Sequence, residues 1–195
     1  MPAYTDFVAM TRADAAEYLA RFLDDQQRSL DRFASTIDRE LTFSPSSLDP
    51  VWDAVVPKFA WRAGYEPPPL GQPGPRIDAD QLEPPEDLPS WFHHPSSAGY
   101  ARFSADTLWL IDGAARYLGE LLIQTAGGRW ASGNERVKGY MYQNQPVITG
   151  ISPEPMSPMQ TCSVLAARSL RQRVERGPRT LADVYNAWRA SAQPQ

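Results

Sequence analysis

The chain has a single cysteine, Cys162, and only two histidines among its 195 residues. One cysteine excludes an internal disulfide and fits a reducing compartment. The two histidines, His93 and His94, are adjacent, so in an extended segment they point to different sides and chelate one ion poorly. No spacing of Cys, His, Asp or Glu completes a metal site around them. We therefore expect exposed loop histidines, no metal and no cofactor.

A long apolar run and a basic cluster are also missing. The longest apolar run lies around residues 121–123, far too short to span a bilayer, and the N-terminal residues lack the apolar stretch of a signal peptide. The 19 Lys and Arg residues are spread along a chain with a net charge of −4, whereas nucleic-acid or membrane binding favours a clustered basic face. These absences predict a cytoplasmic protein that binds neither nucleic acid nor membrane.

Catalytic motifs are absent as well. No serine stands in a G-x-S-x-G context, and Gly127-Gly128 lacks the Lys-Ser/Thr that completes a phosphate loop. Cys162 lies near the start of an expected helix, where the helix dipole can lower a thiol pKa. A base to activate it is not evident, so a small buried core residue is favoured. No residue is assigned a catalytic role.

The most informative segment that the chain does contain is residues 104–130. Apolar residues on most sides predict a buried helix over 104–126, with Gly127 as its left-handed cap, followed by a strand. Gly113 and Gly119 each cost up to about 1 kcal/mol relative to alanine inside a helix. We expect the close approach of a neighbouring backbone to offset that cost.

Helices and strands are also expected on both sides of this central helix. Thr11 and Asp14 form a capping-box pattern for one long amphipathic helix that reaches Ile37. A second helix follows Ser44–Ser47 and is kinked or ended by Pro57. Further helices are expected over residues 160–176 and after Thr180. Alternating residues predict an antiparallel meander with three strands: Arg129–Ala131, Arg136–Tyr142 and Pro146–Thr149.

These elements predict one α+β domain over residues 1–195, with a central buried helix and flanking helices packed on a small antiparallel β-meander. Residues 67–95 differ in composition, because they hold nine of the 19 prolines and several acidic residues. Such a segment supports neither a regular helix nor a central strand. Trp91 and Phe92 at its end suggest a surface arm or loop that is pinned against the domain.

Several short motifs, taken in order, resemble those of a known group of proteins. They are S-P-S-S-L (44–48), Y-L-G-E (117–120), G-G-R-W (127–130), R-G-P (176–178) and L-A-D-V-Y-N-A-W (181–188). The chain resembles a group of small bacterial proteins with a Y-x-G-E…G-G-x-W core, which look like immunity or accessory proteins. The resemblance covers most of the chain outside the arm. It implies a protein-binding function and transfers no active residue.

Glu120 is the most interesting charged residue, because it lies inside an apolar helix. Asp112, Arg116 and Glu120 are spaced by four and form one ladder along that helix. Glu120 is either a buried base or partner-binding carboxylate, or a structural group that forms an ion pair with Arg116 or accepts a hydrogen bond from backbone of the facing strand. The structural interpretation is favoured, since a buried charge normally requires a partner.

A second candidate surface lies on the expected middle strand, where Lys138, Tyr140 and Tyr142 share one face. A solvated face of this composition is typical of interfaces, whereas a covered one is core edge. The candidate partner-binding residues are Glu120, Tyr140, Tyr142, Lys138 and Trp91.

Three functions remain open. The first is a cytoplasmic protein-binding protein, such as an immunity or accessory protein that occupies a partner surface. The second is a small enzyme that uses Glu120, with Asp112, in a cleft between the central helix and the meander. The third is a structural subunit of a larger assembly.

Overall fold

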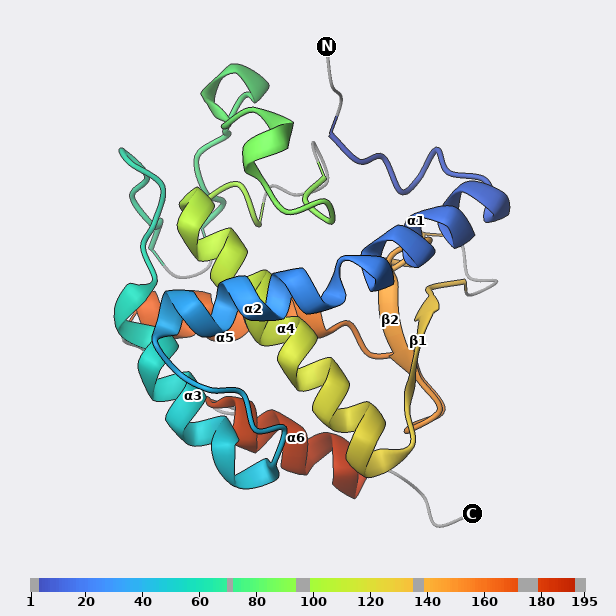
Figure 1. Cartoon of the computed structure of the whole chain (residues 1–195). Coiled ribbons are helices and arrows are strands. Elements are labelled where there is room, and N and C mark those ends of the chain that lie inside the picture. Colours follow the sequence, from blue (N-terminus) through green and yellow to red (C-terminus); the bar gives the residue numbers. More distant parts are fainter. Residues whose placement is uncertain (1–3, 70–71, 94–98, 135–138, 172–178, 192–195) are drawn as a thin grey trace.

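Helix α4 (Ala105–Ala126) runs through the centre of the molecule, with α2 (Gln26–Ile37) packed on its front and α5 (Pro158–Arg171) behind it in Figure 1. The computed structural model describes residues 4–69, 72–93, 99–134, 139–171 and 179–191. Within them the fold is mostly helical α+β, with a single domain. The remaining elements are α1 (Arg12–Asp24), α3 (Leu48–Val55), α6 (Leu181–Ala190), β1 (Arg129–Ser132) and β2 (Pro146–Thr149).

The predicted boundaries and burial of the central helix are confirmed. The Ser104 hydroxyl accepts a hydrogen bond from the backbone N–H of Thr107, and Gly127 ends the helix with φ at 73°. From Thr107 to Leu122 nearly every side chain is buried. Because each fully buried large apolar side chain contributes roughly 1.5–3 kcal/mol, α4 organises the core.

The two helix glycines face aromatic side chains, so the expected approach of a backbone was wrong. A Cβ atom on Gly113 would lie 2.4 Å from Cβ of Phe33 on α2, and one on Gly119 would lie 2.3 Å from Cζ2 of Trp130 on β1. Both distances are far shorter than a carbon–carbon contact allows. Ring packing against a bare helix backbone therefore offsets the low helix propensity of these glycines.

The long N-terminal helix is divided into α1 and α2 at Asp25. The capping box of Thr11 and Asp14 is present as predicted. In an unbroken helix the carbonyl of Phe22 would accept the N–H of Gln26. Here that carbonyl accepts a 2.7 Å hydrogen bond from Nη1 of the buried Arg116, so a long-range contact is formed at the break.

Two of the other predicted helix signals are confirmed. Helix α3 ends at Val55 and passes into a single 3₁₀ turn, Val56–Lys58, that contains Pro57. Thr180 and Asp183 form the capping box of α6. Helix α5 begins at Pro158, two residues earlier than expected. Of the expected helix over 160–176, residues 172–176 lie outside the described residues.

The sheet has two strands in the described residues, and the expected middle strand was wrong over 139–142, which form a turn. Strand β1 pairs antiparallel with β2, with Trp130 opposite Ile148. Gly139 (φ 79°) and Asn144 (φ 62°) are left-handed, so the alternating residues between them belong to a loop. The rest of that expected strand, 136–138, lies outside the described residues. On its other edge β2 is bridged by Met156.

The proline-rich arm wraps onto the domain in its described part, as predicted. Leu88, Trp91 and Phe92 are buried, and the described residues of the arm form only two short 3₁₀ turns, Ala79–Gln81 and Pro85–Asp87. Side chains outside the arm bind its backbone carbonyls. The Tyr4 hydroxyl donates to Glu83 (2.8 Å), the Thr5 hydroxyl to Ser90 (2.6 Å) and the Trp109 indole to Asp87 (2.9 Å).

Candidate functional site

The buried ion pair of α4 joins Arg116 to Asp112. Nε of Arg116 lies 3.0 Å from Oδ1 and 3.2 Å from Oδ2 of Asp112, and both side chains are 2% exposed. The expected pairing of Arg116 with Glu120 was therefore wrong. Asp112 and Glu120 each lie four residues from Arg116 in the sequence, so spacing favours neither carboxylate. The other hydrogen-bond partners of these side chains determine which carboxylate Arg116 binds.

Each member of the buried pair is also held by other elements. Asp112 accepts hydrogen bonds from the Trp91 indole of the arm (2.9 Å) and from the Ser29 hydroxyl of α2. The Arg116 guanidinium donates to Oε1 of Gln26 (2.8 Å) and lies 3.6 Å from the ring centroid of Phe22. The pair thus joins the arm, α1 and α2 to the central helix.

Glu120 closes the same polar network at its half-buried end. Its Oε1 accepts hydrogen bonds from Nε2 of Gln26 (3.1 Å) and from the indole Nε1 of Trp130 (3.0 Å). Both donors are neutral side chains that lie within the domain, Gln26 on α2 and Trp130 on β1. These contacts favour the structural interpretation of Glu120, although its partners differ from those expected.

A large cleft lies on another part of the molecule. Its volume is 570 Å³, and its walls come from the segment before α1, the residues before α4, the β1–β2 loop and the first turns of α5. This size lies within the range of ligand-binding pockets, roughly 300–1,000 Å³. Tyr140 and Tyr142 line it, together with apolar residues (Phe7, Val8, Met141) and polar ones (His93, Tyr100, Arg102, Gln143, Gln145, Gln160, Ser163).

The loop that forms one wall of the cleft is tied down from two sides. The buried Asn144 donates from Nδ2 to the carbonyls of Phe7 (2.8 Å) and Met10 (3.0 Å). Its own N–H donates to the carbonyl of Gly133 (2.7 Å). A Cβ on Gly133 would lie 2.0 Å from the carbonyl oxygen of Tyr142, so only glycine fits there. The two walls are therefore held in one arrangement.

The inner part of the cleft is aromatic and carries little charge. The Tyr100 hydroxyl donates to Oε1 of Gln160 (2.7 Å), and burial raises the pKa of Tyr100 above its usual range. Burial also raises the pKa of Tyr142 and lowers the pKa of His93. All three groups are consequently neutral at pH 7, which leaves Arg102 as the one formal charge among the lining residues that the structure describes.

His93 is buried, so the expectation of an exposed loop histidine was wrong for this residue. Its ring packs edge-on against Phe7 (5.4 Å between ring centroids) and Tyr100 (5.8 Å). Nδ1 lies 3.1 Å from the carbonyl oxygen of Trp91, and because a carbonyl only accepts, Nδ1 carries the proton. His94 lies outside the described residues.

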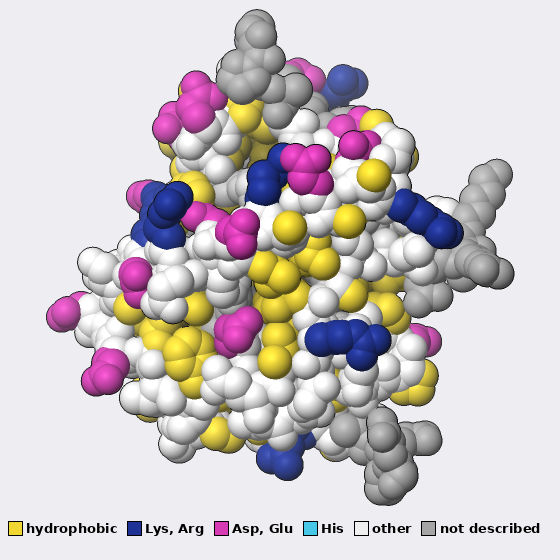
Figure 2. Space-filling model, turned by 45° about the vertical axis from the view of Figure 1, so that its right-hand side comes forward, with side chains coloured by type: hydrophobic (Ala, Val, Ile, Leu, Met, Phe, Trp, Pro, Cys, Tyr) yellow, Lys and Arg dark blue, Asp and Glu magenta, His cyan; other side chains and the backbone are white. Residues whose placement is uncertain are grey.

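The rim of the cleft carries the two most exposed large hydrophobic side chains of the described residues. Val8 is 82% exposed and Met141 67%. The Asp6 carboxylate accepts hydrogen bonds from the N–H groups of Val8 (3.1 Å) and Ala9 (3.2 Å), and this tight turn presents Val8 to solvent. Figure 2 shows a face on which hydrophobic side chains gather near the centre, with single positive and negative charges interspersed around them.

Of the residues expected to bind a partner, the structure brings together only Tyr140 and Tyr142. Their rings meet edge-on at 5.7 Å. Trp91 is 3% exposed and is bound to Asp112, so it serves the fold. Lys138 lies outside the described residues. Val8, Met141 and Arg102 were not among the predicted residues; the Asp6 turn motif is a local signal that could have drawn attention to Val8.

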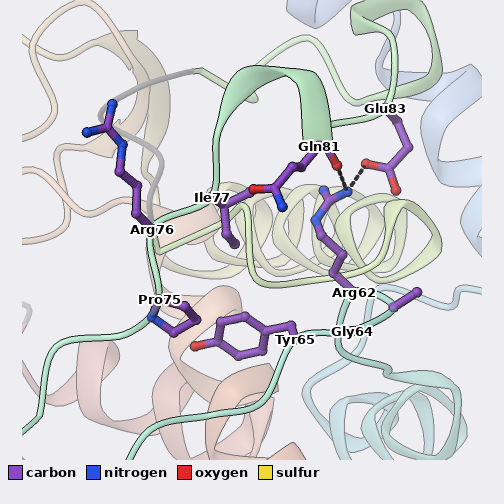
Figure 3. Close-up of a pocket in the computed structure, with 9 residues that line it drawn as sticks. Arg62, Gly64, Tyr65, Pro75, Arg76, Ile77, Gln81 and Glu83 are labelled. Atoms are coloured by element: carbon purple, nitrogen blue, oxygen red, sulfur yellow. Dashed lines mark hydrogen bonds and ion pairs between the residues drawn. The ribbon is translucent and has the colours of Figure 1, made fainter.

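Two other clefts are smaller than the 570 Å³ cleft. One, of 270 Å³, lies between the arm and residues 62–65. Figure 3 shows the Arg62 head group there, donating from Nη1 to the carbonyl of Gln81 (2.9 Å) and pairing with Glu83 (2.7 Å). The other, of 260 Å³, is an apolar groove between α5 and α6 lined by Leu165, Val184 and Trp188. The contacts of Arg62 in the 270 Å³ cleft help to hold the arm. Glu120 lines none of the three clefts described above.

Other candidate sites are not supported. Cys162 is fully buried, as expected of a core residue, and burial raises the pKa of its thiol. Within the described residues, no three His, Cys, Asp or Glu side chains lie close enough together to hold a metal ion. In the same part of the chain, no helix has both the length and the apolar composition needed to cross a membrane.

Comparison with known proteins identifies no relative. No family model, curated protein or solved structure matches this chain. The candidate site therefore rests on the geometry of the cleft and its rim.

Burial of the His93 imidazole predicts that the free energy of unfolding depends on pH. Because the folded-state pKa of His93 is below its unfolded value of 6.5, its contribution is complete above pH 6.5 and is lost as the pH falls through the folded-state pKa. We expect the free energy of unfolding of the wild type to fall more than that of His93→Gln between pH 7.5 and pH 5. Urea unfolding of both proteins at several pH values checks this. Parallel pH profiles would show that His93 does not contribute.

Proposed function

We propose that this chain is a cytoplasmic protein-binding protein that occupies a partner surface with the 570 Å³ cleft and its rim, as an immunity or accessory protein does. One observation carries the proposal. Val8 and Met141 are far apart in the sequence, yet both border the same cleft while remaining largely exposed. Their apolar surface is left in water at a cost of about 25 cal/mol per Å², which a bound partner would recover.

The composition of the cleft supports the same proposal. Tyrosine and methionine are enriched at protein interfaces, and methionine adapts its shape to different partners. Residues that dominate binding energy cluster in well-packed pockets surrounded by a rim that excludes water. Tyr140 and Tyr142, held by the loop contacts of Asn144, supply such a pocket.

The alternatives lack comparable support. In the enzyme alternative Glu120 acts in a cleft, but its carboxylate is hydrogen-bonded to Gln26 and Trp130 and lines none of the three clefts described above. In the structural-subunit alternative the same rim would join copies of this chain or a larger assembly. Size-exclusion chromatography with light scattering distinguishes that case from a monomer that binds a different protein.

The test combines a partner screen with surface variants. A two-hybrid and pull-down screen against the products of neighbouring genes is run with the wild type and with Val8→Asp/Met141→Glu. We expect a partner that the double variant binds at least tenfold more weakly, a loss of about 1.4 kcal/mol. Stability should change by only about 0.5 kcal/mol, as for ordinary surface substitutions.

Leu23→Glu is the matched control, because Leu23 is a hydrophobic residue of α1, 38% exposed and outside the cleft. It should retain binding. If the partner is a toxin, co-expression of the wild type should protect cells and co-expression of the double variant should not. Equal binding by the wild type and the double variant would disprove the proposed surface.

A further inference from the structure

The charge inside the cleft has no counter-ion within the described residues. Among the described residues that line the cleft, Arg102 is the only permanently charged one, and none is an Asp or a Glu. Two other buried or half-buried arginines do have carboxylate partners: Arg62 pairs with Glu83 and Arg116 with Asp112. No described acidic side chain forms an ion pair with Arg102.

Burial removes water from Arg102, and a hydrogen bond with the Tyr65 side chain replaces only part of what the guanidinium loses. The guanidinium lies 5.1 Å from the ring centroid of Phe103 and 5.7 Å from that of Trp61. Its Nε is buried and has no hydrogen-bond partner. A partly desolvated cation of this kind is costly by itself, and it forms stronger charge-assisted hydrogen bonds with an incoming anion than an exposed arginine does.

A second arginine adds to the positive potential. Arg171, in the last turn of α5, lies close enough for its charge to lower the pKa of Arg102, after the larger effect of burial. Its own Nε is also buried without a hydrogen-bond partner. Two like charges at short range repel each other, so an anion bound beside them would relieve that repulsion as well as the desolvation cost.

We infer that the cleft contains an anion subsite at Arg102, supported by Arg171, and that it receives the carboxylate of an acidic side chain flanked by apolar residues of the partner. The aromatic walls and the exposed Val8 and Met141 of the rim suit the apolar neighbours of that carboxylate. This inference rests on the proposed function, because it specifies the chemistry of the segment that the same cleft binds.

The partner chemistry follows from the charges. The whole chain carries −4, and positive and negative side chains are interspersed on the face in Figure 2. A long polyanion such as a nucleic acid needs an extended basic track, which a single half-buried arginine pair does not supply. A single carboxylate needs only the planar guanidinium fork.

The direct test uses simple anions as probes. The Nε–Hε resonances of Arg102 and Arg171 are followed by NMR while propionate, propionamide or inorganic phosphate is added. We expect a saturable shift with propionate, no shift with the isosteric propionamide, and loss of the Arg171 response in Arg102→Met. No saturable response to propionate, or an equal response to propionamide, would overturn the inference. A response to phosphate alone would reassign the subsite to free phosphate and overturn the carboxylate assignment.

A peptide pair then tests the flanking apolar residues. The capped peptides Gly-Leu-Glu-Phe-Gly and Gly-Leu-Gln-Phe-Gly are titrated into the wild type and into Arg102→Met. The wild type should bind the Glu peptide at least tenfold more tightly than the Gln peptide, and Arg102→Met should bind both equally. No preference for Glu in the wild type would overturn the inference.

Further measurements show whether Arg102→Met folds and whether the proposed function and the anion subsite hold independently of each other. Arg102→Met removes a partly buried charge that has no acidic partner among the described residues, so its urea midpoint should equal or exceed that of the wild type. If Val8→Asp/Met141→Glu abolishes partner binding while Arg102→Met leaves it unchanged, the proposed function stands and the anion subsite falls. If no partner depends on the rim, the function fails whatever the anion probes show.

Discussion

Asp112→Ala is expected to lower the free energy of unfolding by about 3–5 kcal/mol, as the removal of one partner from a buried ion pair typically does. The substitution leaves the Arg116 guanidinium, 2% exposed, without its counter-ion. It also removes the acceptor of the Trp91 indole and of the Ser29 hydroxyl. The arm and α2 each lose one polar contact with α4, so the effect should exceed that of removing one hydrogen bond.

Urea unfolding monitored by circular dichroism and tryptophan fluorescence measures this effect. Glu17→Ala is the control, because the exposed Glu17–Arg21 pair on α1 has the same four-residue spacing. Exposed pairs contribute about 0.2–1 kcal/mol, so this variant should remain close to the wild type. A loss below about 1 kcal/mol in Asp112→Ala, the size of one ordinary hydrogen bond, would contradict the role of the pair.

The double variant Asp112→Leu/Arg116→Met separates the unpaired charge from the lost contacts. Replacing a whole buried pair by apolar side chains is often nearly neutral. We expect it to be more stable than Asp112→Ala, yet less stable than the wild type, because Trp91, Ser29 and the Phe22 carbonyl still lose their partners.

Gly113→Ala is expected to lower the free energy of unfolding by about 2–3 kcal/mol, in the upper range for an overpacked core. Alanine is the better helix former by about 1 kcal/mol, so propensity alone predicts the opposite sign. The added methyl would lie 2.3 Å from Cγ and 2.4 Å from Cβ of Phe33. Those atoms are fixed to the backbone of α2, so the helix itself must move.

Gly119→Ala provides the comparison for this prediction. Its methyl would meet Cζ2 of Trp130 at 2.3 Å, which is the far edge of a half-buried ring and can move with less disturbance. We therefore expect a smaller loss than for Gly113→Ala. Adding Phe33→Leu to Gly113→Ala should recover part of the stability. A stabilising Gly113→Ala would show that α2 is not packed directly on this glycine.

The central helix was predictable because its signals are local. Ser104 and Gly127 mark its two ends through hydrogen bonds and dihedral angles within a few residues, and its apolar composition indicates burial on most sides. The capping boxes at Thr11 and Thr180 are predictable for the same reason. Trp91 and Phe92 correctly indicated a pinned arm, since adjacent large aromatics in a loop rarely remain in water.

The division of the N-terminal helix was not predictable, because its cause lies far away in the chain. The pattern from Thr11 to Ile37 is helical throughout. The carbonyl of Phe22 is nevertheless bound by Arg116, 94 residues away. The expected strand over 136–142 failed for a related reason. Alternation alone does not distinguish a strand from a loop in which Gly139 and Asn144 adopt left-handed dihedral angles.

By itself, the sequence determined most helix positions and several caps, the burial of α4 and the absence of the familiar catalytic motifs, because these depend on composition and on neighbours a few residues apart. Only the tertiary structure decided that Arg116 pairs with Asp112 and not with Glu120, and that Val8 and Met141 border one cleft. Both carboxylates have the same spacing from Arg116. The choice depended on Ser29 and Trp91, which long-range packing brings to Asp112.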